Sequence, residues 1–308
     1  MAQGQELSAV DRAATLERLA EGTRLRPSRR ARLWRLARRK LLGTISAFII
    51  LLLAVLAVFG PYIAPYGAYE KNMLDRLQGP STTHFFGTDE VGRDVFSRVI
   101  AGARISLRIG FLAVALGTVI GSTIGLISGY FEGRLDMVLQ RIADGLMAFP
   151  GLVFLIAIVA FLGQGMDKAI IGISILLWPG ANRIVRGTVL SVKRNTFVEA
   201  ARSIGAGDSW IIYRHILPNV AAPIIIIAST AVGAAILLEA SLGFLGLGNP
   251  YPSPGWGTML SGPGRSQMER APWLALAPGL AISIAVLSFN LLGDALRDIW
   301  DPRLRGTS

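Results

Sequence analysis

The sequence predicts an all-α integral membrane protein with six transmembrane helices and a short pair of cytoplasmic helices between spans four and five. Three observations support this fold class. Hydrophobic residues make up 52% of the 308 residues, and only 17% are charged. Uncharged runs long enough to cross a hydrocarbon core of about 30 Å recur along the chain. Lys and Arg gather between alternate runs, as expected of segments that stay in the cytoplasm.

Six apolar runs mark the predicted spans. A spanning helix needs about 20 apolar residues, and the fourth run fits least well because two arginines interrupt its end. The first run is longer than the core of a signal peptide and no A-x-A site follows it, so we interpret it as a retained anchor. The runs cover residues 41–69, 109–131, 145–166, 169–190, 216–238 and 271–293.

The distribution of charge sets the expected orientation. With the N-terminus inside, the inner segments hold 19 Lys and Arg and the outer segments hold 7, so both termini are expected in the cytoplasm. The net charge of +11 does not indicate nucleic acid binding, because eleven basic residues lie in 1–43, beside the first span, without a recognition motif. We divide the chain into a basic tail (1–40), an anchor (41–66), an extracytoplasmic loop (67–103), a core with five spans (104–294) and a cytoplasmic tail (295–308).

Within the spans, small and helix-breaking residues predict local geometry. Four glycines recur every four residues in the second span, which favours close packing of another helix along one ridge. They are Gly117, Gly121, Gly125 and Gly129. Pro150 is expected to kink the third span, and the kink is a candidate part of a pathway. The outer loop 247–272 is rich in Pro and Gly and predicts no regular structure in 249–257, with Trp256 and Trp273 as interface anchors.

The loop between spans four and five carries the most specific pattern. Thr196 and Glu199 form a T-x-x-E capping box that predicts the start of a helix. The residues at 197, 200, 201 and 204 then share one face, and Gly205 is suited to end the helix in a left-handed conformation. Asp208 is expected to cap a second short helix, and Pro218 to mark entry into the fifth span. A helix of about eight residues is unstable alone in water, so it must dock on something.

This loop resembles the EAA motif of binding-protein-dependent ABC importer permeases. Glu199-Ala200-Ala201, Gly205 and Ile216-Leu217-Pro218 carry the resemblance, with His215 where the general pattern has Ile. The segments 86–98 and 102–107, together with 148–150, 255–257 and 301–303, are similar to the dipeptide/oligopeptide branch, DppC/OppC type. The resemblance covers about residue 35 to the end.

The resemblance implies the type I ABC importer permease fold and a role in the bacterial cytoplasmic (inner) membrane. The chain would form half of a passage for di- or oligopeptides, and the helix of the EAA motif would couple ATPase motion to alternating access. The implied partners are a second homologous permease, two cytosolic ATPase subunits, an extracytoplasmic binding protein and the lipid bilayer. ATP and Mg²⁺ would be bound by the ATPase subunits, with no cofactor in this chain. The same architecture also imports nickel complexes or glutathione.

The sequence also indicates which activities to exclude. None of the four lysines follows a glycine, so no P-loop occurs, and we find no catalytic motif, metal cluster or internal repeat. We therefore expect no enzyme activity in this chain, and a secondary transporter working without ATPases is the less favoured alternative. Among charged residues in spans, Arg141 and Asp144 are expected to pair, and Arg183 and Arg186 to reach the inner surface. Glu239 is a candidate residue of the pathway. The alternatives are that it forms a structural ion pair or that it lies at the outer surface.

Overall fold

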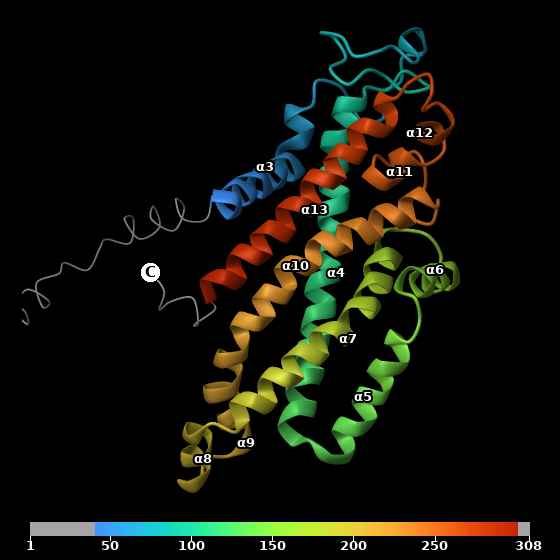
Figure 1. The fold of residues 1–308 in the computed structure, drawn as a ribbon. Helices are drawn as coiled ribbons and strands as arrows, with labels where there is room; N and C mark the ends of the chain where they lie inside the picture. The colour runs from blue at the N-terminus through green and yellow to red at the C-terminus, as the bar shows by residue number, and fades with distance from the viewer. Residues whose placement is uncertain (1–40, 301–308) are drawn as a thin grey trace, which may run out of the picture. The chain divides into compact units, whose positions relative to one another are not determined.

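Figure 1 shows the computed structural model, which describes residues 41–300. Within these residues the chain is helical apart from its loops and one isolated β-bridge between Thr88 and Asp94. Residues 42–300 belong to one compact unit. Five helices are long and apolar enough to cross a membrane, and a pair of helices with a sharp bend between them makes a sixth span if the pair counts as one. The predicted all-α membrane fold is confirmed.

The long helices are α3, α4, α7, α10 and α13, which cover Leu41–Ile63, Val95–Phe131, Met166–Lys193, Leu217–Phe244 and Trp273–Trp300. The bent pair is α5 and α6, which cover Gly133–Met147 and Gly151–Leu162. The short elements are η1, α8, α9, η2, α11 and α12, which cover Met73–Asp75, Thr196–Ser203, Asp208–Ile211, Ile212–Ile216, Trp256–Leu260 and Pro263–Ser266. Helices α4, α7, α10 and α13 form the packed core, with α8 and α9 at one end and α11 and α12 at the other (Figure 1).

Helices α4 and α7 pack along the ridge of glycines that the sequence marks. A Cβ at Gly121 would lie 2.4 Å from the carbonyl oxygen of Trp178, and one at Gly125 would lie 2.6 Å from that of Asn182. Gly117 and Gly129 face the same helix, against Ser174 and Arg186. The two backbones approach so closely that only glycine fits between them, as in other membrane helix pairs with small residues at their interface.

Replacing Gly121 by valine is therefore expected to destabilise the chain. The added carbons would meet the backbone of α7, which cannot move aside like a side chain, so we expect a cost of at least about 1–3 kcal/mol. The measurement is thermal unfolding of the purified chain in detergent. Gly180→Ala in α7 is the control, because nothing lies within 4 Å of a Cβ there. Equal melting temperatures for Gly121→Val and the wild type would show that α4 and α7 are not held at this distance.

The third predicted span differs from expectation. Pro150 does not kink one helix; it separates α5 from α6, whose axes differ by 93°. Proline has no N–H to donate to the α5 ladder and disfavours the helical conformation of the residue before it. The chain therefore leaves the helix after Met147, and Pro150 becomes the N-cap of α6.

The start of this span was also placed too late in the sequence. Helix α5 begins at Gly133, one residue beyond the cap Glu132 that ends α4, rather than at residue 145. It carries Arg134, Asp136, Arg141 and Asp144, so a search for uncharged runs passes over it. Glu132 has a positive φ of 55°, and its carboxylate accepts a hydrogen bond of 2.7 Å from Lys193, which lowers its pKa.

The fifth span begins before its proline rather than at it. Residues 208–244 form one continuous helical stretch, in which η2 is a π-helical turn. The N–H of Leu217 bonds to the carbonyl of Ile212, five residues back, just before Pro218, which has no N–H to donate. A wider turn at this point accommodates the missing donor.

The outer loop is more ordered than its composition predicts. Trp256 begins α11 and is 1% exposed, with its indole N–H donating to the carbonyl of Val99 at 2.9 Å. It is thus a core residue rather than an interface anchor. Trp273 is half-buried and donates to the carbonyl of Thr88. Trp256 thus joins the outer loop to α4, and Trp273 joins α13 to the loop before α4, which sequence composition alone does not show.

Helix α3 makes few contacts with the rest of the unit. Its buried residues are Ser46, Leu53 and Gly60, which follow one another at intervals of seven. Gly60 lies against Ile100 of α4, where a Cβ would be 2.9 Å from the side chain. Most other side chains of α3 are apolar and exposed, as expected of a helix surrounded by lipid or by a partner helix.

Candidate functional site

The loop that resembles the EAA motif begins with a helix whose cap differs from the prediction. The N-cap of α8 is Asn195, and Thr196 is already inside the helix. The carbonyl of Asn195 accepts from the N–H groups of Val198 and Glu199, at 2.9 and 3.4 Å, and no side chain caps the helix. The capping box of Thr196 and Glu199 is therefore absent, because the helix starts one residue earlier than that motif requires. Glu199 is exposed in the first turn, where its charge is favourable to the helix dipole.

The end of α8 agrees with the prediction. Gly205 has φ of +85°. Its N–H bonds to the carbonyl of Arg202 at 2.9 Å, and the N–H of Ala206 bonds to that of Ala201 at 3.0 Å. These two bonds form a Schellman motif, which needs a left-handed residue at this position. The turn fixes the direction in which the chain leaves the helix.

The apolar residues of α8 divide between two faces, rather than sharing the single face that the spacing predicts. Val198 and Ala201 are buried against a cluster that includes Tyr130, Val185 and Ile216. Phe197 is 41% exposed and Ile204 is 83% exposed, and Ala200 is exposed between them. One face thus anchors α8 to the ends of α4, α7 and η2, and the opposite face presents apolar groups outward.

The second half of the loop is fixed by polar and apolar contacts. Gly207, not Asp208, is the N-cap of α9; Asp208 instead accepts a hydrogen bond of 2.5 Å from the hydroxyl of Tyr130. Ile216 is fully buried, whereas Leu217 and Pro218 are exposed at the start of α10. The EAA-like residues are thereby held together at one end of the helix bundle.

The two candidate pathway residues lie apart from this loop. Glu239 lies within α10 and is 2% exposed, with its Oε2 atom lacking a hydrogen-bond partner among the described residues. It is not at the outer surface. Its Oε1 atom lies close to Gly255, where a Cβ would be 3.5 Å away. Pro150 is exposed at the break between α5 and α6.

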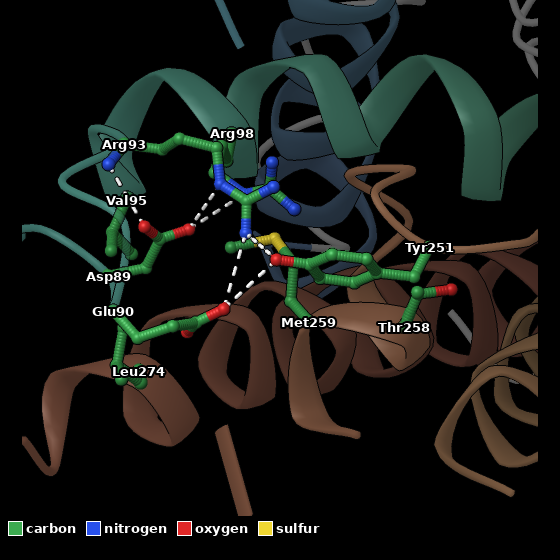
Figure 2. Close-up of a pocket in the computed structure, with 9 residues that line it drawn as sticks. All are labelled: Asp89, Glu90, Arg93, Val95, Arg98, Tyr251, Thr258, Met259 and Leu274. Carbon is green, nitrogen blue, oxygen red and sulfur yellow. Dashed lines mark hydrogen bonds and ion pairs between the residues drawn. The ribbon is translucent and has the colours of Figure 1, made fainter. Parts of the chain in front are cut away.

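A cluster of charged residues at the opposite end from α8 was not predicted from the sequence. Figure 2 shows Arg93 between the carboxylates of Asp89 and Glu90 and the hydroxyl of Tyr251. These residues line a cavity of about 30 Å³. Arg93 Nε donates to Asp89 at 2.5 Å, Nη2 donates to Tyr251, and the Tyr251 hydroxyl donates to Glu90 at 2.9 Å. Arg98 donates to the carbonyls of residues 68 and 252.

This charged cluster joins the loop before α4 to the loop after α10. Burial disfavours the charged form of Arg93, but its hydrogen bond and attraction to Asp89 outweigh burial and raise the pKa of the guanidinium. Burial also raises the pKa of Tyr251. The density of charged residues in 89–98 was a visible sign of a charged cluster in the sequence. Tyr251, the partner of Arg93, lies more than 150 residues away in a loop whose composition gives no indication of the contact.

Charged side chains of α5 and α7 also pair differently from expectation. Arg183 donates to Asp144 at 2.8 Å, so Asp144 does not pair with Arg141. Arg186 makes two hydrogen bonds of 2.6 Å to Asp136. The i, i+3 spacing of Arg141 and Asp144 permits a local pair, but the facing helix offers Asp144 a closer partner. The two arginines therefore bind α5 rather than extend to the end of α7.

The fold defines a multi-pass helical membrane protein with an anchored helical loop between two spans. Residues 121–306 match the family model described as binding-protein-dependent transport system inner membrane component, and residues 28–80 match the N-terminal TM domain of oligopeptide transport permease C. The chain belongs to this family, as an ABC importer permease of the dipeptide/oligopeptide type. The resemblance seen in the sequence is confirmed, including the DppC/OppC branch.

Relatives and solved structures agree with this membership. The chain is 45% identical to the glutathione transport system permease protein GsiD of Pectobacterium atrosepticum, over 88% of this chain and 90% of the relative. It is 47% identical to GsiD of Escherichia coli strain 536, over 89% and 90%. Chains of the inward-facing MetNI methionine ABC transporter share the fold at 18–19% identity, with TM-scores of 0.53 and 0.55; each covers 66% of this chain, and the match covers 96% and 97% of those chains.

Proposed function

We propose that this permease forms half of an ATP-driven passage for glutathione or similarly short peptides, and that α8 is its docking element for a cytosolic ATPase. The observation that carries the docking role is the outward face of α8. Phe197 and Ile204 expose apolar surface on a helix whose opposite face is anchored. Exposed apolar groups on a rigid short helix favour insertion into a groove of a partner.

The geometry of the loop supports coupling as well as docking. Only residues 194 and 195 separate α7 from α8, and Val198 packs in the same cluster as Val185 and Val189 of α7. A displacement of α8 by an ATPase would therefore be transmitted to a spanning helix through packed side chains. In this proposal Glu199, Ala200, Ala201, Gly205 and the segment 216–218 form the coupling loop, and Thr196 contributes its first helical residue.

The substrate proposal follows from the relatives. The GsiD proteins are named for glutathione, a tripeptide, and the oligopeptide permease model also matches this chain. This favours the glutathione alternative over nickel, and it keeps peptides as the substrate class. The remaining partners would be a second homologous permease, two ATPase subunits that bind ATP and Mg²⁺, and an extracytoplasmic binding protein that delivers the substrate.

Uptake by the reconstituted complex tests this function. Proteoliposomes containing both permeases and the ATPases, with the binding protein on the outside, are expected to accumulate glutathione or a short peptide only when ATP is enclosed. A hydrolysis-dead ATPase serves as the control and should abolish uptake. Accumulation by the two permeases without any ATPase would instead support a secondary transporter, and accumulation of nickel alone would overturn the peptide class.

Orientation is a further expectation, with α8 and both termini in the cytoplasm. The chain has no native cysteine, so single cysteines report their side cleanly. Ser191 near the α8 end and Ser81 in the loop before α4 are both exposed. Cysteine at Ser81 is expected to react with an impermeant thiol reagent added to whole cells, and cysteine at Ser191 only after the membrane is opened. Reaction of both in intact cells contradicts this orientation.

A further inference from the structure

A polar cavity of about 430 Å³ lies between α5 and α7. Its lining includes three arginines and two aspartates, Arg141, Arg183, Arg186, Asp136 and Asp144, which leave one net positive charge. Arg183 pairs with Asp144 and Arg186 pairs with Asp136, whereas Arg141 makes no ion pair within residues 41–300. Charged residues within spans are rare and face a bundle interior or a water-filled space.

The depth of this cavity follows from the packing of its helices. Arg183 lies ten residues from the end of α7, which corresponds to about 15 Å at 1.5 Å per residue. Asp144 lies eleven residues from the start of α5, a similar depth. The neighbouring α4 gives an independent measure of the position of Arg183 along the bundle. Residues 178–182 of α7 face Gly121 and residues 182–186 face Gly125, and both glycines lie within an uncharged run of α4 that ends at Phe131. The pair of Arg183 and Asp144 therefore lies about 15 Å from the α8 end of α7, at the level of the uncharged run of α4.

The exposure of the Arg183–Asp144 pair indicates what surrounds it. The side chain of Arg183 is 57% exposed and that of Asp144 is 48% exposed. An ion pair exposed to this extent beside an apolar run of α4 is not expected to face lipid tails, because the cost of charge in hydrocarbon is too high. It must face water or another polar surface. The less exposed pair of Arg186 and Asp136 lines the same cavity, nearer to the α8 end of α7.

We infer that this cavity is a section of the substrate passage, in which Arg141 and Arg183 bind carboxylates and Asp144 binds the ammonium group of a short peptide. The inference rests on the proposed function and identifies the residues that would select its substrate class. Glutathione carries two carboxylates and one ammonium group at neutral pH, so its net negative charge complements the net positive charge of the lining. Planar guanidinium groups suit carboxylates because they donate two parallel hydrogen bonds.

The first test is thiol labelling in membranes that contain the complete transporter. Arg183→Cys, and Arg141→Cys, which breaks no ion pair, are compared with Leu287→Cys in α13. Leu287 is 59% exposed and lies thirteen residues from the end of its helix, so it matches Arg183 in exposure and approximate depth. A charged thiol reagent is expected to modify positions 141 and 183 roughly a hundredfold faster than position 287, since charge enters hydrocarbon poorly. S-methylglutathione, which has neither a free thiol nor a disulfide, or an unreactive dipeptide should slow the reaction.

Labelling of all three positions at similar rates, or of none at 141 and 183, would overturn the inference, as would labelling that substrate does not slow. The wild-type complex is assayed for ATP-driven uptake in parallel. Uptake that persists while the labelling result fails would reject the passage role of the cavity and leave the proposed function standing, so the two failures are distinguishable.

A charge exchange separates binding from a structural role. Arg183→Asp alone is expected to lose transport, since two aspartates then face each other. The double variant Arg183→Asp/Asp144→Arg restores an ion pair, so it should assemble normally. Its KM for glutathione should still be raised tenfold or more, because losing one contact with the substrate costs about 1.4 kcal/mol of binding free energy. The exchange Lys193→Glu/Glu132→Lys near the ends of α7 and α4 is the matched control, with KM unchanged. Full recovery of KM in the 183/144 double variant would show that the pair is only structural.

Discussion

Valine in place of Gly205 is expected to abolish ATP-driven uptake while leaving the chain in the membrane. Gly205 has φ of +85°, where a β-branched side chain is a severe outlier. The left-handed conformation costs an ordinary L-residue about 1–2 kcal/mol, and valine more. The Schellman turn would open, the exposed face of α8 would lose its fixed direction, and the ATPase would bind weakly. Co-purification of the ATPase and hydrolysis stimulated by the loaded binding protein measure the effect.

Gly205→Asn provides the control for this variant, because asparagine tolerates the left-handed region far better than valine does. No atom lies within 4 Å of a Cβ at this position, so backbone conformation rather than a clash decides the outcome. We expect near-normal coupling in the asparagine variant. Equal, normal ATPase association in the Gly205→Asn and Gly205→Val variants would contradict the docking role of α8.

Methionine in place of Arg93 is expected to destabilise the end of the molecule that lies opposite α8. Arg93 is 1% exposed, and its removal leaves Asp89 and Glu90 close together without their shared cation. Breaking a buried pair by removing one partner costs about 3–5 kcal/mol. Asp89 keeps the backbone N–H of Val91, and Arg98 lies 3.9 Å away, so the lower end of this range is expected.

Thermal unfolding of the purified chain in detergent measures this cost, and Arg76→Met is its control. Arg76 lies in the same loop and is exposed, so its replacement should leave the melting temperature unchanged. If the Arg93→Met and Arg76→Met variants have the same melting temperature, the charged cluster of Figure 2 does not hold the loop before α4 to the loop after α10.

Local features of this fold were predictable from the sequence. The glycines at intervals of four identified the ridge on which α7 packs, since helix periodicity alone puts them on one face. Gly205 was identified as a helix end because few other residues adopt its conformation. The apolar runs located five spans, and the resemblance to the EAA motif singled out the loop that contains α8.

Features that depend on distant partners were not predictable. Helix α5 was missed because its charges face a polar cavity and charged pairs on α7 rather than lipid, so a rule based on uncharged runs passes over it. Arg141 and Asp144 have the spacing of a local pair, yet Asp144 binds a residue 39 positions away. Thr196 and Asn195 are both suited to cap a helix, and sequence alone does not choose between them. Trp256 was predicted to be an interface anchor, but its ring is buried against Val99 and Gly102 of α4.

Helix α7 continues as one helix from Met166 to Lys193 although it contains Pro179, and its length has a mechanical consequence. At 1.5 Å per residue its 28 residues span about 42 Å. A rigid rod of this length that tilts by about 10° around Met166 would carry its α8 end through about 7 Å and Arg183 through about 4 Å. Helix α4, joined to it along four glycines, would have to tilt with it. A displacement at the α8 end would then move both helices together and shift the wall of the polar cavity between α5 and α7.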